Sequence, residues 1–335
     1  MASLATVAGY LGQECFNSLY IDGEFVATDG GTFDTVTPQP HSTSWAPTWL
    51  LAPALPAAPH PLDPLPPAHP LATHLPAAFS PSRPAHLARR QVAPASERVL
   101  HAVPRGTVAD MERAIAAARA AFDETDWGIS AGSYRAGFLR ALAAKLEEHK
   151  EVIAEIESVD MGKHVDDASA DVDMCIGLLE ENADLAEQLD AQNNREVEGN
   201  ELNTGYVRYE PFGVVGAITP WNYPIACVVV KLAPALAAGN TMVIKPSEYT
   251  PLSSMLLAQL CADVGFPKGV VNSVTGLGAD VGASLAESPD IDSARPRTPL
   301  SHLPTCRPEL LRKPGRNLLL FCGLLPVSAA LLCVR

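Results

Sequence analysis

Three short apolar runs organise the second half of the chain. They span residues 214–218, 241–244 and 270–274, and each is bounded by glycine or a polar turn and followed by a helical pattern of apolar positions. Uninterrupted β-branched runs that alternate with helices are typical of parallel strands buried on both faces. The pattern predicts an α/β fold with a parallel sheet and flanking helices.

Strands and amphipathic helices are also predicted before this region. Residues 16–38 read as two strands joined by Asp-Gly turns. A helix is predicted to start with a capping-box pattern at Thr107, and two more are predicted over 134–159 and 165–190, because their apolar residues recur on one helical face. Residues 193–209 are polar and alternating, unlike the apolar helical faces before them.

Two segments differ from the rest in composition. Residues 39–94 hold 14 of the chain's 30 prolines, and proline fixes φ and lacks an amide donor, so neither helix nor central strand is predicted there. We expect this Pro/Ala/His-rich insert to be disordered. Translated non-coding sequence is the favoured interpretation, and a proline-rich linker is the alternative. Residues 293–335 form a tail that ends in an apolar run, 318–334, about long enough to span a bilayer. Read-through or frame-shifted sequence is the favoured interpretation of this tail, and a membrane anchor is the alternative.

The net charge and the pattern of cysteines limit which partners this protein can bind and in which compartment we expect it. A net charge of -14 argues against nucleic acid or an anionic membrane as a partner. The seven cysteines form no CxxC pair, so neither a zinc site nor a disulfide framework is predicted, and a reducing compartment is expected. The N-terminus lacks the basic region and apolar core of a secretion signal. These features favour a cytoplasmic location, with an organelle as the alternative.

Candidate binding residues follow each of the three apolar runs. In parallel α/β sheets the ligand lies beyond the carboxyl ends of the strands, and here those ends lead into 219–223, 245–248 and 276–282. The last segment reads Gly-x-Gly-x-x-x-Gly, in which glycines let a backbone approach a phosphate at a helix N-terminus. A plain strand-to-helix turn is an equally good interpretation of that one motif.

Taken together, these segments resemble the aldehyde dehydrogenase superfamily. ITPWNYP, KLAPALAAGN, KPSEYTP and TGLGADVG match the family's cofactor half in order and spacing, and MGKHVDDASADVDM and ADLAEQLDAQ are most similar to betaine-aldehyde and aminoaldehyde dehydrogenases. The resemblance covers residues 16–36 and 95–292. It implies a Rossmann-type sheet in which 1–38 supply N-terminal strands, 95–292 form the NAD-binding domain, and an arm at 193–209 pairs with a neighbouring subunit of a homo-oligomer. It also implies oxidation of an aldehyde, with NAD and water, to a carboxylic acid and NADH.

The resemblance assigns roles to individual residues. It implies that Asn222 stabilises an oxyanion through its neutral amide, that Lys231 acts in a charge relay, and that Asp171 lies near a monovalent cation. The implied dinucleotide site consists of Ile218, Thr219, Pro220, Trp221, Asn222, Lys245, Pro246, Ser247, Glu248, Gly278 and Gly282. A carboxylate at Glu248 would accept hydrogen bonds from the adenosine ribose and repel a 2′-phosphate, which favours NAD over NADP.

Each of these residues also has a plainer interpretation. Asn222 could cap a turn before a proline, and the segment at Lys245 could be a surface turn. A structural salt bridge explains Lys231 as well as a catalytic role does. For Asp171, a solvated acid on a helix is the favoured interpretation.

Two departures from the family bear on activity. Where betaine-type members carry a pair of tyrosines, this chain has Glu181-Asn182, and because aromatic faces usually hold quaternary ammonium groups, a betaine aldehyde is less favoured as the substrate. After Asp292 the family's segments with the general base and the nucleophilic cysteine do not follow. Cys306 and Cys322 lack surroundings that would lower a thiol pKa.

We therefore expect a cofactor-binding portion, truncated before the catalytic domain, that is inactive alone. The alternative from another class is a non-catalytic dinucleotide-binding or oligomerising module, tethered to a membrane by the apolar run at 318–334.

Overall fold

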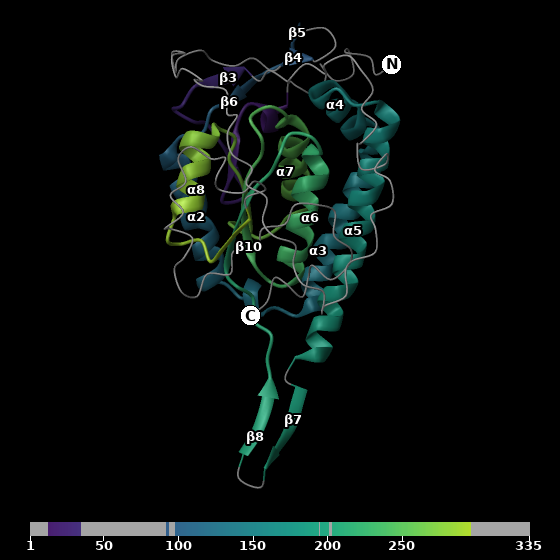
Figure 1. Ribbon diagram of the computed structural model, residues 1–335, viewed down its shortest axis with the longest axis vertical. Coiled ribbons are helices and arrows are strands. Elements are labelled where there is room, and N and C mark those ends of the chain that lie inside the picture. The colour runs from purple at the N-terminus through teal and green to yellow at the C-terminus, as the bar shows by residue number, and fades with distance from the viewer. Residues whose placement is uncertain (1–12, 35–91, 94–97, 194, 201–202, 296–335) are drawn as a thin grey trace, which may run out of the picture. The chain divides into compact units, whose positions relative to one another are not determined.

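The computed structural model describes residues 13–34, 92–93, 98–193, 195–200 and 203–295 (Figure 1). The helices are η1 (Glu14–Phe16), α2 (Val108–Asp123), η3 (Trp127–Ile129), α3 (Gly132–Glu148), α4 (Lys150–Met161), α5 (Val165–Gln192), α6 (Pro224–Ala237), α7 (Leu252–Val264), η4 (Gly278–Gly282) and α8 (Ala283–Glu287). The strands are β1 (Leu19–Ile21), β2 (Glu24–Val26), β3 (Thr32–Asp34), β4 (Val92–Ala93), β5 (Arg98–Val99), β6 (Ala102–Pro104), β7 (Arg195–Asn200), β8 (Asn203–Val207), β9 (Val214–Ile218), β10 (Thr241–Lys245), β11 (Val271–Ser273) and β12 (Ser293–Arg295).

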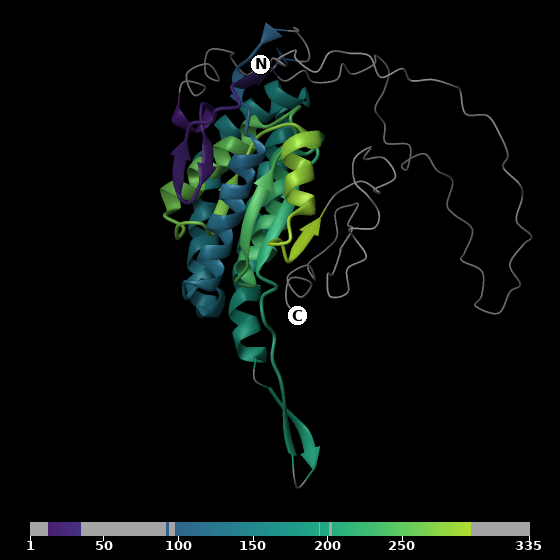
Figure 2. The same cartoon turned by 90° about the vertical axis from the view of Figure 1, so that its left-hand side faces the viewer.

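The main sheet has the strand order β12-β9-β10-β11-β1-β2. Its first four strands are mutually parallel, and the β1–β2 hairpin adds two antiparallel strands beside β11. Figure 2 shows the edge strand β12, at the yellow end of the colour bar, beside the green strands. The three apolar runs therefore form adjacent parallel strands, as their sequence pattern predicts.

Helices cover both faces of the sheet. Alternate residues of a strand point to opposite faces, and accordingly Met242 and Ile244 pack into the core shared with α6 and α7, whereas Val243 packs into the core shared with α2 and α8. In Figure 1, α2 and α8 lie to one side of β10, and α6, α7, α3 and α5 lie to the other. Burial on both faces explains why these strands are apolar throughout.

The structure confirms several predicted boundaries and corrects others. Thr107 and Asp110 form a reciprocal capping box at the start of α2. The single helix predicted over 134–159 is wrong, because His149, with φ -106° and ψ 11°, ends α3 and precedes α4. The apolar pattern did not reveal this break, since Leu146 and Ile153 are seven residues apart, about two helical turns, and both stay buried.

The region 16–38 also contains more than the two predicted strands. Residues Thr32–Asp34 form a third strand, β3, which pairs with β6. Its partner follows the proline-rich segment, so the pairing is non-local and no short-range pattern indicates it. The described residues within 193–209 contain strands β7 and β8, which form a two-stranded sheet separate from the main one.

The predicted insert and tail lie almost wholly outside the described residues. Two parts of them are described: Val92–Ala93 form β4, and Ser293–Arg295 form β12, which pairs with β9 in the main sheet. Asp292, just before β12, accepts hydrogen bonds from the backbone amide of Val214 at 2.8 Å and from Arg119. The sheet therefore extends three residues beyond the predicted domain boundary at 292. The apolar run at 318–334 is outside the described residues.

Candidate functional site

The loops that follow β9, β10 and β11 meet at one edge of the sheet. Parallel pairing sets Lys245 beside Ile218 and Ile244 beside Ser273, so the carboxyl ends of these strands are level. The Thr219 amide donates to the Lys245 carbonyl at 3.1 Å, and the Thr250 hydroxyl donates to the Trp221 carbonyl at 3.0 Å. The first two loops are thus joined by direct hydrogen bonds.

Lys245 and Glu248 form an ion pair inside this edge. The Nζ of Lys245 lies 2.7 Å from Oε2 of Glu248, and the side chains are 2% and 21% exposed. A buried ammonium requires a compensating partner because the low-dielectric interior penalises an isolated charge. The surface turn that was one interpretation of this segment is excluded by the burial of Lys245.

The third loop reaches the same ion pair. Burial alone would raise the pKa of Glu248, but the Lys245 ammonium and the backbone amide of Gly278 outweigh it, so the pKa is lowered and the carboxyl is ionised at neutral pH. A Cβ added at Gly278 would lie 3.8 Å from Oε1 of Glu248, and one at Gly282 would lie 3.8 Å from Cδ of Lys245. These are ordinary contact distances, so packing within the described residues does not by itself demand glycine at either position.

Thr219 places an unsatisfied hydroxyl at this edge. The residue is 4% exposed, and among the described residues its Oγ1 has no hydrogen-bond partner. Such a group costs free energy unless a ligand or water completes it. A dinucleotide requires a surface with polar groups and an accessible backbone. The Thr219 hydroxyl and the Glu248 carboxylate supply polar groups, and Gly278 and Gly282 leave the backbone accessible.

The other residues predicted for this site lie in the first two loops. Pro220, Trp221 and Asn222 follow β9 and are half-buried, Pro246 and Ser247 follow β10 and are buried, and Ile218 ends β9. The Ser247 hydroxyl accepts a hydrogen bond from the Tyr249 amide at 3.2 Å. The fold therefore carries all of these predicted residues on the loops of one sheet edge or on the strand ends that lead into them.

Lys231 lies within α6, about two turns beyond the loop that carries Asn222. Its ammonium donates to the Cys227 carbonyl, one turn earlier, at 2.9 Å. This intrahelical bond satisfies one donor of a half-buried lysine on an otherwise apolar helix. The charge-relay role stays a prediction.

Asp171 is ion-paired with Lys163, which also contacts Glu157 at 2.9 Å. The Asp171 side chain is only 14% exposed, so it is not the solvated acid of the plainer interpretation. Within the described ranges no cluster of His, Cys, Asp or Glu has a metal-ligand arrangement. Its cation role stays a prediction, and the Lys163 ammonium already supplies a positive charge there.

Two buried acids near these loops, Glu157 and Asp160, were absent from the predicted site. Both are 0% exposed and lie on α4. A signal existed, because Asp160 falls on the helical face of Ile153 and Ile156, at spacings of seven and four. Acids on an apolar face must find a partner, and here the partners are the amides of two other helices.

Comparison with known proteins agrees with this arrangement of parallel strands and loops. The family model described as the aldehyde dehydrogenase family matches residues 84–295. Because the match covers more than half of the sequence, the chain belongs to the aldehyde dehydrogenase family. The match begins inside the predicted insert and ends with β12.

Relatives within the family are aminoaldehyde and betaine aldehyde dehydrogenases. The chain is 45% identical over 203 residues to aminoaldehyde dehydrogenase 2, peroxisomal, from Malus domestica, covering 59% of this chain and 40% of the relative. It is 43% identical over 204 residues to betaine aldehyde dehydrogenase, chloroplastic, from Amaranthus hypochondriacus, with the same coverage. The chain thus spans about two fifths of the length of these relatives.

A solved structure with the same fold is betaine aldehyde dehydrogenase from Staphylococcus aureus in complex with NAD+. The TM-score is 0.67 at 28% identity, over 88% of this chain and 47% of that chain. The aldehyde-dehydrogenase-type sheet expected from the sequence is therefore confirmed.

Among the described residues, no helix combines the length and the apolar character that crossing a bilayer requires.

Proposed function

We propose that this chain binds NAD at the edge of the sheet formed by the loops after β9, β10 and β11. The observation that carries the proposal is the convergence of Lys245, Glu248 and Gly278 there. An ionised carboxylate is the acceptor that ribose hydroxyls need, and it repels a 2′-phosphate. The complex of the Staphylococcus aureus relative with NAD+ supports the same cofactor.

The remaining residues of the site have separate tasks in this proposal. The Thr219 hydroxyl gains its missing partner from the cofactor, and Gly278 and Gly282 allow the backbone close approach. The Asn222 amide donates a hydrogen bond to an aldehyde oxygen as negative charge develops on it. When bound, NAD supplies the hydride acceptor for aldehyde oxidation.

The substrate class and assembly are proposed from the relatives. Their names support an amino- or betaine-type aldehyde as the family substrate of this chain. The β7–β8 hairpin offers an extended arm for pairing with a second copy in a homo-oligomer. The peroxisomal and chloroplastic locations in those names favour an organelle over the cytoplasm.

Equilibrium titration of the purified chain with NAD and NADP tests the cofactor proposal. We expect NAD to bind more tightly than NADP, and Glu248→Gln to weaken NAD binding about tenfold or more, because a hydrogen bond to a charged group contributes about 1.5–3 kcal/mol. Glu248→Gln should also reduce the ratio of the NAD affinity to the NADP affinity, because it removes the charge that repels a 2′-phosphate. Glu124→Gln, at an exposed acid after α2, is the matched control and should bind as the wild type does. An unchanged NAD affinity in folded Glu248→Gln would refute the assignment.

A further inference from the structure

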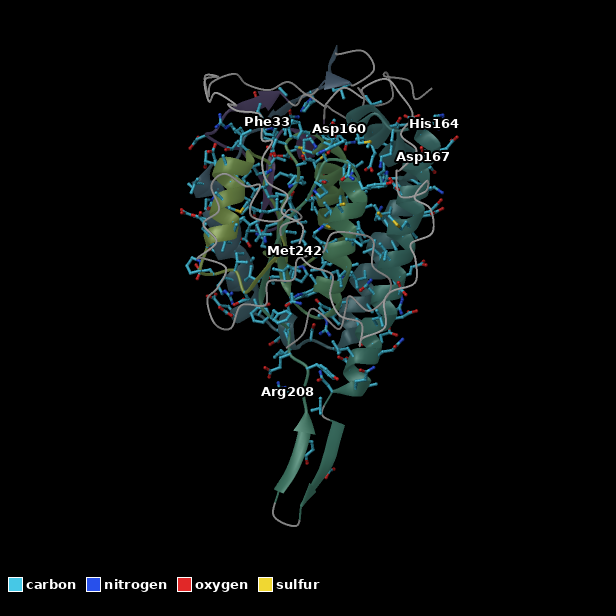
Figure 3. The ribbon with its side chains drawn as sticks, in the orientation of Figure 1. Phe33, Asp160, His164, Asp167, Arg208 and Met242 are labelled. Carbon is cyan, nitrogen blue, oxygen red and sulfur yellow. The ribbon has the colours of Figure 1, made fainter. Side chains whose placement is uncertain are left out.

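Helix α4 carries two acidic side chains that are fully buried. Glu157 and Asp160 are both 0% exposed and lie about one turn apart. Figure 3 places Asp160 at the upper end of the molecule in this view, while Met242 of β10 lies near its middle. Burying two carboxylates is costly, so their contacts indicate what they do.

Glu157 binds the start of α6. Its Oε2 accepts a hydrogen bond from the Ile225 amide at 3.1 Å, across 68 residues of sequence. Its Oε1 accepts one from Lys163 at 2.9 Å. The Lys163 ammonium lies 4.6 Å from the ring centre of Tyr223, the residue that follows Asn222. Glu157 and its cation thus contact both sides of the junction between loop 219–223 and α6.

Asp160 binds the start of α7 in the same way. Its Oδ2 accepts a hydrogen bond from the Leu252 amide at 2.9 Å, across 92 residues of sequence. Leu252 directly follows the loop that carries Glu248. Burial, together with the nearby Glu157 carboxylate, raises the pKa of Asp160, although the Leu252 amide opposes the shift.

Neither α6 nor α7 is capped by its own N-cap side chain. The N-cap residues are Tyr223 and Pro251, and neither makes a side-chain cap hydrogen bond. The first amides of a helix have no partner within the helix and form its positive end. Carboxylates from α4 therefore supply what the local sequence of both helices lacks.

We propose that Glu157 and Asp160 are positioning residues for the nucleotide site, holding the first turns of α6 and α7 and thereby the spacing between loops 219–223 and 246–251. The inference rests on the proposed function, because these two loops carry the candidate NAD residues. The Thr250 hydroxyl bond to the Trp221 carbonyl joins the loops, so displacement of either helix end disturbs both.

The test combines amide hydrogen–deuterium exchange of the NAD-free chain with NAD titration. Glu157→Ala should speed exchange across 219–225, and Asp160→Ala across 246–252, each with about fivefold weaker NAD binding, because each loses one hydrogen bond of about 1 kcal/mol that holds a helix end. Asp160→Asn keeps an acceptor oxygen for the Leu252 amide and should restore both readouts. Glu157→Gln keeps one for the Ile225 amide but loses the ion pair with Lys163, so it should restore them in part. Glu151→Ala, at an exposed acid of the same helix, should change neither.

Two results would overturn the inference. One is wild-type exchange in these loops together with wild-type NAD affinity in the alanine variants. The other is faster exchange spread evenly over all helices, which indicates a general structural role. If the alanine variants do not fold, Glu157→Asp replaces them, because it withdraws the carboxylate by one methylene. It should give the same local effects in smaller degree, and their absence would also overturn the inference. If the wild-type chain does not bind NAD, the proposed function is contradicted but the positioning inference is not. Hydrogen–deuterium exchange still reports whether Glu157 and Asp160 hold the two loops.

Discussion

Thr219 and Thr250 illustrate two uses of a buried threonine at the same sheet edge. The Thr250 hydroxyl donates to the Trp221 carbonyl, whereas among the described residues the Thr219 hydroxyl has no partner. A polar group kept buried without a partner lowers stability. Its retention is explained if the group serves a ligand, as proposed for NAD.

Replacement of each threonine by valine should separate these two uses. For Thr219→Val we expect an unfolding free energy about 1 kcal/mol or more above that of the wild type, because the change removes an unpartnered buried hydroxyl. We also expect about fivefold weaker NAD binding, the loss of one hydrogen bond of about 1 kcal/mol. Thr250→Val, the matched control, should lower the unfolding free energy by about 1–2 kcal/mol because it leaves the Trp221 carbonyl unpaired. Denaturant unfolding and NAD titration measure both quantities. Equal destabilisation by the two changes would contradict this account.

The connection from α7 to β11 depends on two glycines for different reasons. Gly265 ends α7 with φ +79°, and an added Cβ would meet open space. Gly269 has φ +74°, and its Cβ would lie 2.4 Å from the Ala117 carbonyl of α2. The first position requires only a left-handed backbone, while the second also sets how closely α2 approaches the strand.

Alanine at the two positions should therefore differ in cost. Gly265→Ala should destabilise the chain by about 1–2 kcal/mol, the cost of a left-handed conformation in an L-residue. Gly269→Ala adds a steric clash with backbone and should cost at least about 2 kcal/mol more. Thermal or denaturant unfolding of both variants gives the comparison. Similar losses would show that the approach of α2 to Gly269 relaxes freely.

Three of the four described thiols, those of Cys15, Cys175 and Cys261, are buried and poorly suited to act as nucleophiles in aldehyde chemistry. Burial raises the pKa of Cys15 and of Cys261 to about 12, and burial with the nearby Glu157 and Asp171 carboxylates raises that of Cys175. The attacking species in thiol catalysis is the thiolate, which a raised pKa suppresses. No Gly-Gln-x-Cys segment follows Asp292. The segment Gly12 to Cys15 has this spacing, but it precedes the sheet and ends at Cys15, whose thiol pKa is raised by burial.

We therefore predict that the 335-residue polypeptide forms no NADH from NAD and a panel of aldehydes, even where it binds NAD. NADH absorbance measures the rate, with a full-length aldehyde dehydrogenase as the positive control. A robust rate abolished by a thiol-alkylating reagent would contradict the prediction.

Local sequence patterns were sufficient to predict the strands and the helix start nearest the candidate site. Three of the four parallel strands follow from their uninterrupted apolar runs, and the start of α2 follows from Thr107 and Asp110. The family motif places Lys245 and Glu248 in the loop after β10. The helix break at His149 was missed because the apolar period continues across it. The pairing of β3 with β6 was missed because its partner lies beyond the proline-rich segment.

The chain's own residues thus specify the three central parallel strands, most of its helices and the loops that carry the candidate cofactor residues, because hydrophobic period and turn chemistry act over a few neighbours. Folding alone decides that Glu157 and Asp160 of α4 reach the first amides of α6 and α7, across 68 and 92 residues. It also decides that Thr219 is buried without a protein partner among the described residues. Those features depend on packing between segments distant in sequence, and no local pattern contains that information.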